Sequence, residues 1–294
     1  MEIIDGKAVA SVLKTKMAAE VAIRKTTGLK VPHLAAILVG NNGSSETYVA
    51  NKIKACKEVG FFSSTFRYPD TITENDLLEV INQINNNDDI DGFIVQLPLP
   101  KHIAENKVIN SIKPSKDVDG FHPENTGRMI KNLPCYIAAT PYGILKLIEH
   151  YKIETKGKHC VVVGRSNIVG SPISILMSRD TYPGNCTVTL CHSKTQNLSE
   201  YTSKADILII ALGKPGFVNA DMVKQGAVVI DIGLTRVEDK TKKSGFSLKG
   251  DVNYDEVAPK CSFITPVPGG VGPMTIVALL ENTLKAAKKE VYNS

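Results

Sequence analysis

The chain has 294 residues, of which 43% are hydrophobic and 22% are charged. This composition is that of an ordinary globular protein, and the length suffices for two domains of typical size. The net charge of +5 is mild, and Lys/Arg runs never exceed two residues, so a nucleic-acid partner is not expected. The apolar stretches are too short to span a bilayer, so a membrane partner is not expected either.

The cysteines and the N-terminus bear on the compartment. The six cysteines are scattered without a CxxC pair, which argues against a disulfide framework and a zinc site. The first residues, MEIIDGKAVA, lack the basic start and apolar run of a signal peptide. We therefore expect a cytoplasmic protein. Because the sequence also lacks an HxxxH pair, a Walker loop and a nucleophile elbow, we expect no metal site.

Helical and strand patterns alternate along the first half of the chain. The spacing of apolar residues predicts helices over 7–25, 46–59 and 74–85, and strands over 33–39, 61–68 and 92–96. A series of strands and helices in alternation is typical of an α/β fold with a mostly parallel sheet.

A second alternating series begins near Thr140. It predicts helices over 141–151 and 170–179, strands over 160–163, 186–191, 205–211 and 227–232, and a polar surface excursion over 238–245. The last helix is expected from Met274 to Ala287, with Pro273 at its first position. We therefore expect two domains, 1–139 and 140–272, with the C-terminal helix 273–294 packing back on the first. A cleft between two such lobes is a favoured ligand site.

The segment CVVVGRSNIVGSP (160–172) has the order strand, tight turn, helix start. Gly164 ends the strand and Gly170 lies near the start of the helix, where backbone N–H groups and the helix dipole favour a phosphate. The pattern is not GxGxxG, because Ser166 and Val169 stand where further glycines are usual. With the alternating elements around it, the segment predicts a Rossmann-like dinucleotide site.

The next strand indicates which dinucleotide binds. It ends in TLCHSKT (189–195) and lacks the acid that holds the ribose hydroxyls of NAD. Arg165 in the turn and Ser193 after this strand instead suit the 2′-phosphate of NADP. The sequence therefore predicts NADP over NAD, while a surface role for Arg165 stays open.

The first lobe carries the candidate reacting groups. Tyr48 and Lys52 are four residues apart and share one face of the expected helix. A lysine held beside a phenol in a cleft can transfer protons, although such pairs are also common on solvated helices. Gln96 ends a buried strand, where a polar side chain either lines a site or bonds loop backbone. Asp117 and Asp119 precede a glycine turn, and either can cap the next helix, while Asp119 can also accept bonds from an amino-heterocycle.

The segment PVPGGVGPMT (266–275) is stiff backbone that is nearly free of side chains. Taken alone, it is a capping loop before a helix. Taken with the rest of the chain, it suits a surface on which a flat ligand lies against backbone, in the cleft opposite Lys52.

Together these segments resemble one family, the bifunctional methylenetetrahydrofolate dehydrogenase/methenyltetrahydrofolate cyclohydrolase, often called FolD. The resemblance covers essentially the whole chain. The matching pieces, in family order, are YVANK (48–52), VQLPLP (95–100), KDVDGFHP (116–123), TPYG (140–143), GRSNIVGSP (164–172), CHSKT (191–195), DIG (231–233), GDV (250–252) and PVPGGVGPMT (266–275).

The resemblance implies two α/β lobes, a folate substrate, a homodimer, and oxidation of 5,10-methylenetetrahydrofolate followed by hydrolysis to 10-formyltetrahydrofolate. It implies that Lys52 is the general acid/base, Tyr48 packs on the folate, Gln96 supports Lys52 and Asp119 holds the pterin. The implied further substrate contacts are Leu97, Pro268, Gly269 and Gly270, and the implied cofactor contacts are Gly164, Arg165, Ser166, Ser193 and Leu234.

Two alternatives remain at this point. One is a dehydrogenase of the same build that acts on another small acid, and the other is a non-catalytic nucleotide-binding protein. Relative to shorter bacterial members, the chain also carries extra residues around 180–185 (DTYPGN). They either alter the edge of the adenine pocket or have no effect.

Overall fold

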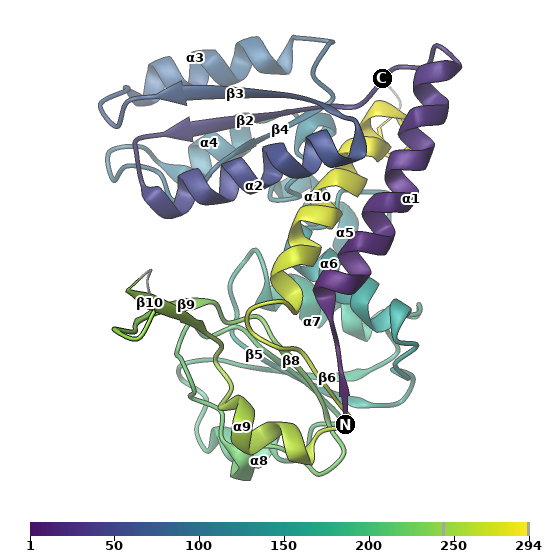
Figure 1. Ribbon diagram of the computed structural model, residues 1–294, viewed down its shortest axis with the longest axis vertical. Helices are drawn as coiled ribbons and strands as arrows, with labels where there is room; N and C mark the ends of the chain where they lie inside the picture. Colours follow the sequence, from purple (N-terminus) through teal and green to yellow (C-terminus); the bar gives the residue numbers. More distant parts are fainter. Residues whose placement is uncertain (243–244, 293–294) are drawn as a thin grey trace. The chain divides into compact units, whose positions relative to one another are not determined.

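The computed structural model describes residues 1–242 and 245–292, and it divides into two compact units (Figure 1). Unit 1 comprises Met1–Ala10 and Thr140–Thr275, and unit 2 comprises Ser11–Ala139 and Ile276–Ser294. The sequence led us to expect one domain over 1–139, whereas the first ten residues group with unit 1. The physical reason is that β1 (Glu2–Ile3) pairs in parallel with β11 (Phe263–Ile264) of unit 1.

Unit 2 is built on a three-stranded parallel sheet in the order β3-β2-β4. Its strands are β2 (His33–Val39), β3 (Phe62–Tyr68) and β4 (Gly92–Val95). The central strand β2 reads HLAAILV and is buried along nearly its whole length, as expected for a parallel strand that is covered on both faces.

Helices cover both faces of this sheet (Figure 1). One face is covered by α1 (Gly6–Thr26), α2 (Gly43–Val59) and α10 (Val271–Ala287), and the other by α3 (Glu74–Asn85) and α4 (Glu105–Ser111). Two shorter elements, η1 (Pro114–Lys116) and α5 (Pro123–Ile130), follow α4 in the chain. Alternate residues of β2 point to opposite faces. Leu34 and Leu38 belong to one buried cluster with residues of α1, α2 and α10, and Ile37 and Val39 belong to another with residues of α3 and α4.

A buried asparagine fixes α10 within unit 2. The Asn282 side chain is 0% exposed, and its Nδ2 donates to the backbone oxygens of Val118 and Ile137, each at 2.9 Å. Both carbonyl groups lie in loops, outside the hydrogen bonds of a sheet. The Asn282 amide therefore supplies a donor to two backbone oxygens that need one. The C-terminal helix is thereby joined to unit 2 by polar as well as apolar contacts.

Unit 1 is built on a six-stranded sheet in the order β1-β11-β8-β7-β5-β6, with parallel pairing throughout. Besides β1 and β11, its strands are β5 (His159–Val163), β6 (Thr187–Cys191) at the edge, β7 (Ile207–Ile210) and β8 (Val228–Asp231). Its helical segments are α6 (Ala139–His150), α7 (Gly170–Ser178), α8 (Leu198–Thr202), η2 (Ala220–Met222), α9 (Tyr254–Val257) and η3 (Ala258–Lys260). This is a Rossmann-like arrangement, in which ligands bind beyond the carboxyl ends of the strands.

Two local features differ from the expectation or complete it. The polar excursion 238–245 joins an antiparallel hairpin of β9 (Thr235–Glu238) and β10 (Phe246–Lys249), and residues 243–244 of it lie outside the described residues. Helix α10 begins at Val271 rather than Met274. A proline in the first turn is tolerated there because the first four N–H groups of a helix have no intrahelical partner.

The extra segment 180–185 lies just before β6, at the amino-terminal ends of the strands. The Tyr182 hydroxyl donates to the backbone oxygens of Ile148 and Ile153, each at 3.3 Å. Because the segment packs on the loop before β5, it lies at the sheet edge opposite the Gly164 turn. The geometry therefore favours the expectation that it leaves the adenine pocket unaltered.

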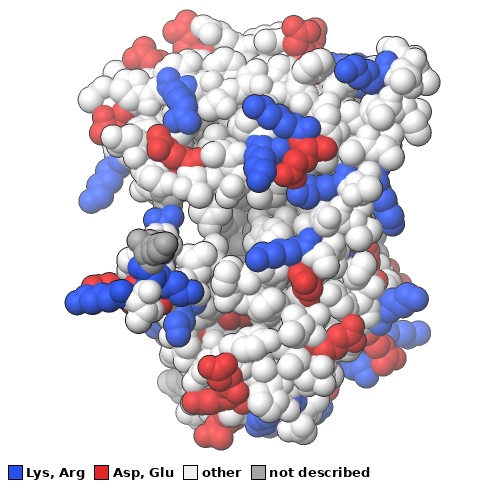
Figure 2. Space-filling view, viewed as in Figure 1, with Lys and Arg blue, Asp and Glu red and all other residues white. Residues whose placement is uncertain are grey.

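The described surface carries charges of both signs. On the face shown in Figure 2, lysine and arginine side chains are interspersed with aspartate and glutamate over both units. Among the described residues, no helix combines the length and the apolar character needed to cross a bilayer.

Asp117 holds the turn that follows η1 in unit 2. Its carboxylate accepts hydrogen bonds from the backbone N–H groups of Phe121 at 3.2 Å and His122 at 2.8 Å, and from Asn125 Nδ2 at 2.9 Å. The residue is 1% exposed, and burial raises the pKa of this carboxyl to about 7, although the three donors act in the opposite direction. Neither Asp117 nor Asp119 caps the next helix, since His122 Nδ1 accepts the Glu124 N–H there.

This raised pKa predicts a pH-dependent stability. Between the unfolded pKa of about 4 and the folded value of about 7, the folded state binds the extra proton, so stability is lost as pH rises through this window. We expect the stability of the wild type relative to Asp117→Asn to fall by about 2 kcal/mol from pH 5 to pH 7. Urea titrations across this range measure it, with the exposed Asp70→Asn as matched control. A difference that is constant with pH would contradict the assignment.

Candidate functional site

A lysine and a glutamine meet at the carboxyl end of β4 in unit 2. Lys52 lies on α2, and its Nζ donates to Gln96 Oε1 at 3.2 Å. Gln96 Nε2 donates to the backbone oxygen of Leu97 at 2.8 Å. Because the amide nitrogen is held by that carbonyl, its oxygen faces the lysine. Gln96 therefore both lines a site and bonds loop backbone, the two roles that the sequence left open.

Tyr48 lies one helical turn before Lys52 on α2, and its side chain is 45% exposed. Its neighbour Val49, about 100° further around the helix, is buried in the core. The helix is thus anchored by its apolar face, and it leaves the phenol ring open to a ligand surface.

Asp119 completes the charged groups near Lys52. Burial raises the pKa of its carboxyl, and the Lys52 ammonium acts in the opposite direction. The Asp117 bonds described above fix the turn that carries Asp119. The structure therefore brings Lys52, Gln96 and Asp119 together, as the sequence predicted, on α2, the end of β4 and this turn.

The predicted nucleotide residues lie at the carboxyl edge of the unit 1 sheet. Gly164 follows β5 with φ of +120°, a conformation that side chains rarely adopt. Residue Val163 pairs with Cys191, so Arg165 and Ser193 each come two residues past a paired position. Both are exposed, and the register of the strands brings the two loops to the same edge.

Ser166 takes part in the turn itself. Its Oγ accepts hydrogen bonds from the N–H groups of Val169 at 3.2 Å and Gly170 at 3.4 Å, at the start of α7. A hydroxyl that accepts can still donate to a ligand. Leu234 lies just beyond β8 at the same edge of the sheet and is 41% exposed.

The Pro/Gly segment also belongs to unit 1 and follows β11. Gly270 N donates to the Pro266 oxygen at 2.8 Å, and Lys7 N donates to the Gly269 oxygen at 3.1 Å. The Val267–Pro268 peptide is cis. The substrate contacts expected of Pro268, Gly269 and Gly270 stay a prediction.

Two buried acids were missed as functional candidates. Asp231 and Asp251 lie in the DIG and GDV segments, and they are 3% and 0% exposed. The signal in the sequence is an acid at the end of the apolar run VVID, where a charge needs partners. The role of such an acid depends on the groups that donate hydrogen bonds to it in the folded chain, and the sequence does not show these groups.

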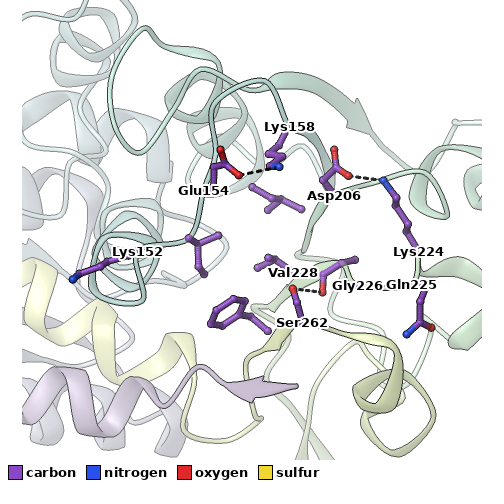
Figure 3. Close-up of a pocket in the computed structure, with 13 residues that line it drawn as sticks. Lys152, Glu154, Lys158, Asp206, Lys224, Gln225, Gly226, Val228 and Ser262 are labelled. Atoms are coloured by element: carbon purple, nitrogen blue, oxygen red, sulfur yellow. Dashed lines mark hydrogen bonds and ion pairs between the residues drawn. The ribbon is translucent and has the colours of Figure 1, made fainter.

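A cavity of about 290 Å³ lies at the opposite, amino-terminal edge of the unit 1 sheet (Figure 3). Two ion pairs, Lys158–Glu154 at 3.1 Å and Lys224–Asp206 at 2.6 Å, lie on its wall. The residues that line it do not include a predicted site residue. Because these charges already have partners, we place the nucleotide site at the carboxyl edge and not here.

Comparison with known proteins agrees with both halves of this description. Residues 4–119 match the catalytic domain of tetrahydrofolate dehydrogenase/cyclohydrolase, and residues 138–291 match its NAD(P)-binding domain. The bifunctional protein FolD of Bacteroides thetaiotaomicron is 62% identical over 292 residues, which are 99% of this chain and 100% of the relative.

Two solved structures are similar over the full length. The FolD methylenetetrahydrofolate dehydrogenase/cyclohydrolase of Campylobacter jejuni has a TM-score of 0.92 at 44% identity, covering 99% of each chain. The FolD of Trypanosoma brucei, solved with NADP cofactor and inhibitor, has a TM-score of 0.92 at 36% identity, covering 99% of this chain and 98% of that one. The chain belongs to the tetrahydrofolate dehydrogenase/cyclohydrolase family.

Proposed function

We infer that this chain oxidises 5,10-methylenetetrahydrofolate to 5,10-methenyltetrahydrofolate with NADP and then hydrolyses the product to 10-formyltetrahydrofolate. The observation that carries this inference is the Lys52–Gln96 bond of 3.2 Å within the part of the chain that matches the catalytic domain. The NAD(P)-binding match over 138–291 supports the use of a dinucleotide in the oxidation step.

The cofactor residues fit NADP. The exposed guanidinium of Arg165 and the exposed hydroxyl of Ser193 lie in the loops that follow the paired parallel strands β5 and β6. A guanidinium and a hydroxyl together suit a phosphate monoester. NADP, when bound, supplies the acceptor for the hydride that leaves the methylene carbon. At the same edge, Gly164 leaves backbone open to the cofactor, Leu234 offers apolar surface, and the Ser166 hydroxyl can donate a hydrogen bond.

In the hydrolytic step, water adds to the methenyl carbon and loses one proton, which gives a neutral carbinolamine. The hydroxyl of this carbinolamine then gives up its proton as the bond from the carbon to N5 breaks and N5 takes up a proton. The formyl group is left on N10, and one proton is released overall. We propose that Lys52 Nζ takes up the proton that the attacking water loses and later releases it, since a lysine held in a cleft can transfer protons. Gln96 keeps Nζ in place because its own amide is fixed by Leu97. The Asp119 carboxylate accepts from pterin N–H groups, and the Tyr48 ring packs on the folate.

We also propose that the chain acts in the cytoplasm as a homodimer with a folate as its small-molecule partner. All six cysteines are free thiols, which is usual in a reducing compartment. Strand β3 is an edge strand of the unit 2 sheet, and Phe62 on it is 61% exposed. Exposed sheet edges with apolar side chains favour association.

The role of Lys52 predicts a separation of the two activities. We expect Lys52→Met to lower methenyltetrahydrofolate hydrolysis at least about 100-fold, because proton transfer is lost, while measurable dehydrogenase remains. The two rates are followed by absorbance with each substrate. Lys54→Met, an exposed lysine on the same helix, is the matched control. Methenyl hydrolysis by the Lys52→Met variant within about tenfold of the wild-type rate would disprove the role.

The Arg165–Ser193 assignment predicts the cofactor preference. We expect Arg165→Ala to lower the ratio of kcat/KM for NADP to that for NAD by about 10- to 100-fold, because a charge-assisted bond to phosphate is lost. Steady-state kinetics with both dinucleotides give the ratio. Lys158→Ala, which removes a cation at the other edge of the sheet, should leave it unchanged. Equal use of both dinucleotides by the wild type would refute the preference.

The dimer is tested by mass. Light scattering on the purified chain should give twice the monomer mass of 31.8 kDa, and Phe62→Lys should shift the population toward monomer, because a charge on an edge strand opposes pairing. A wild-type mass of one chain at micromolar concentration would exclude the homodimer.

A further inference from the structure

Two buried aspartates at the carboxyl edge of the unit 1 sheet each accept hydrogen bonds from the backbone of a neighbouring loop. Asp231 is the last residue of β8, and Asp251 follows β10. The Asp231 carboxylate accepts from the N–H groups of Gly233 at 2.8 Å, Asp251 at 3.1 Å and Val252 at 2.9 Å. Asp231 thus ties the loop after β8 to the loop after β10.

Asp251 in turn holds the loop after β7. Its carboxylate accepts hydrogen bonds from three consecutive backbone N–H groups, those of Leu212 at 2.6 Å, Gly213 at 3.0 Å and Lys214 at 2.6 Å. Successive amides that converge on one point form an anion-binding nest. Here the protein's own carboxylate occupies the nest, so this loop is held in one conformation and does not offer its amides to a ligand phosphate.

Two glycines let the carboxylates approach. A Cβ on Gly233 would lie 2.6 Å from Asp251 Oδ1, and a Cβ on Gly250 would collide with Asp231 Oδ2. The glycines of the DIG and GDV segments therefore each face the aspartate of the other segment. This reciprocal packing explains why both segments pair an aspartate with a glycine.

The loop that Asp251 holds borders the nucleotide turn. Ala211, directly before the three amides, donates its N–H to the Val163 oxygen at 2.9 Å, and its own carbonyl oxygen lies where a Cβ on Gly164 would stand. Leu234 follows Gly233 on the loop that Asp231 holds. The two carboxylates thus fix the backbone on one side of the edge that a dinucleotide crosses.

We propose that Asp231 and Asp251 form a positioning pair for NADP, which holds the 212–214 and 233–234 loops rigid beside the Gly164 turn without contacting the cofactor. The proposal rests on the proposed function in that the ligand at this edge is a dinucleotide. It assigns Asp251 as the member on which cofactor affinity depends, because three amides lose their acceptor together when it is removed.

The test uses the full-length protein with Asp251→Ala, Asp251→Asn and Gly250→Ala. The Asn side chain keeps the volume but has one acceptor oxygen, and it places an NH₂ group against a backbone N–H. The Gly250→Ala variant keeps both carboxylates and displaces Asp231. The matched control is Asp206→Asn, since Asp206 also accepts a backbone N–H, that of His159 at 2.9 Å, at the other edge of the sheet.

Calorimetric titration with NADP and kinetics of both activities are measured for each variant. We expect the Kd and KM for NADP to rise about tenfold or more in Asp251→Ala and less in Asp251→Asn. The dehydrogenase kcat should recover at saturating NADP, and hydrolysis of methenyltetrahydrofolate, which consumes no dinucleotide, should stay within about twofold of wild type. The Asp206→Asn control should bind NADP as the wild type does.

Two results would overturn the proposal. One is wild-type NADP affinity in Asp251→Ala. The other is a parallel loss of both activities or of folding in all three variants, which would reduce the pair to a structural role. A wild-type protein that binds NADP but does not oxidise methylenetetrahydrofolate would instead refute the proposed function, while the titrations would still decide the role of the pair.

Discussion

Buried carboxylates that accept backbone N–H groups hold the functional loops of both units. A loop that lines a site leaves the sheet ladder, and its buried amides then need acceptors. Asp117 supplies them to the turn that carries Asp119, and Asp251 supplies them to the loop after β7. The cost is a buried charge, which several N–H donors offset.

The sheets determine where these loops meet. Parallel pairing brings the carboxyl ends of the strands to one edge, so Gly164, Ser193 and Leu234 lie along the same edge although up to 70 residues separate them. In unit 2, the same rule places Gln96 at the end of β4, and the apolar face of α2 turns Lys52 toward it. Local patterns create the elements, and strand register assembles the site.

This division explains what the sequence could predict. The strand 33–39 and the helix 74–85 have the predicted bounds, because burial and period are local signals. The pairing of Glu2–Ile3 with β11 was missed, since a two-residue strand is defined by its distant partner. The hairpin across 235–249 was missed because its strands carry a mixed polar pattern. Gln96 and Lys52 were found by chemistry at strand and helix positions, whereas Asp251 is recognisable only by three amides 37 to 39 residues away.

Buried acids and exposed cations at the carboxyl edge of the unit 1 sheet together account for the electrostatics of ligand choice. Asp231 and Asp251 are bound to amides of their own unit, so their charge is screened by dipoles that point at it. Arg165, by contrast, lies exposed on the turn after β5. The strand that usually supplies a ribose-binding acid ends here in His192 and Ser193. An edge whose buried acids are bound to backbone amides, and whose exposed cations include Arg165 and Lys194, favours the more anionic of the two dinucleotides, NADP.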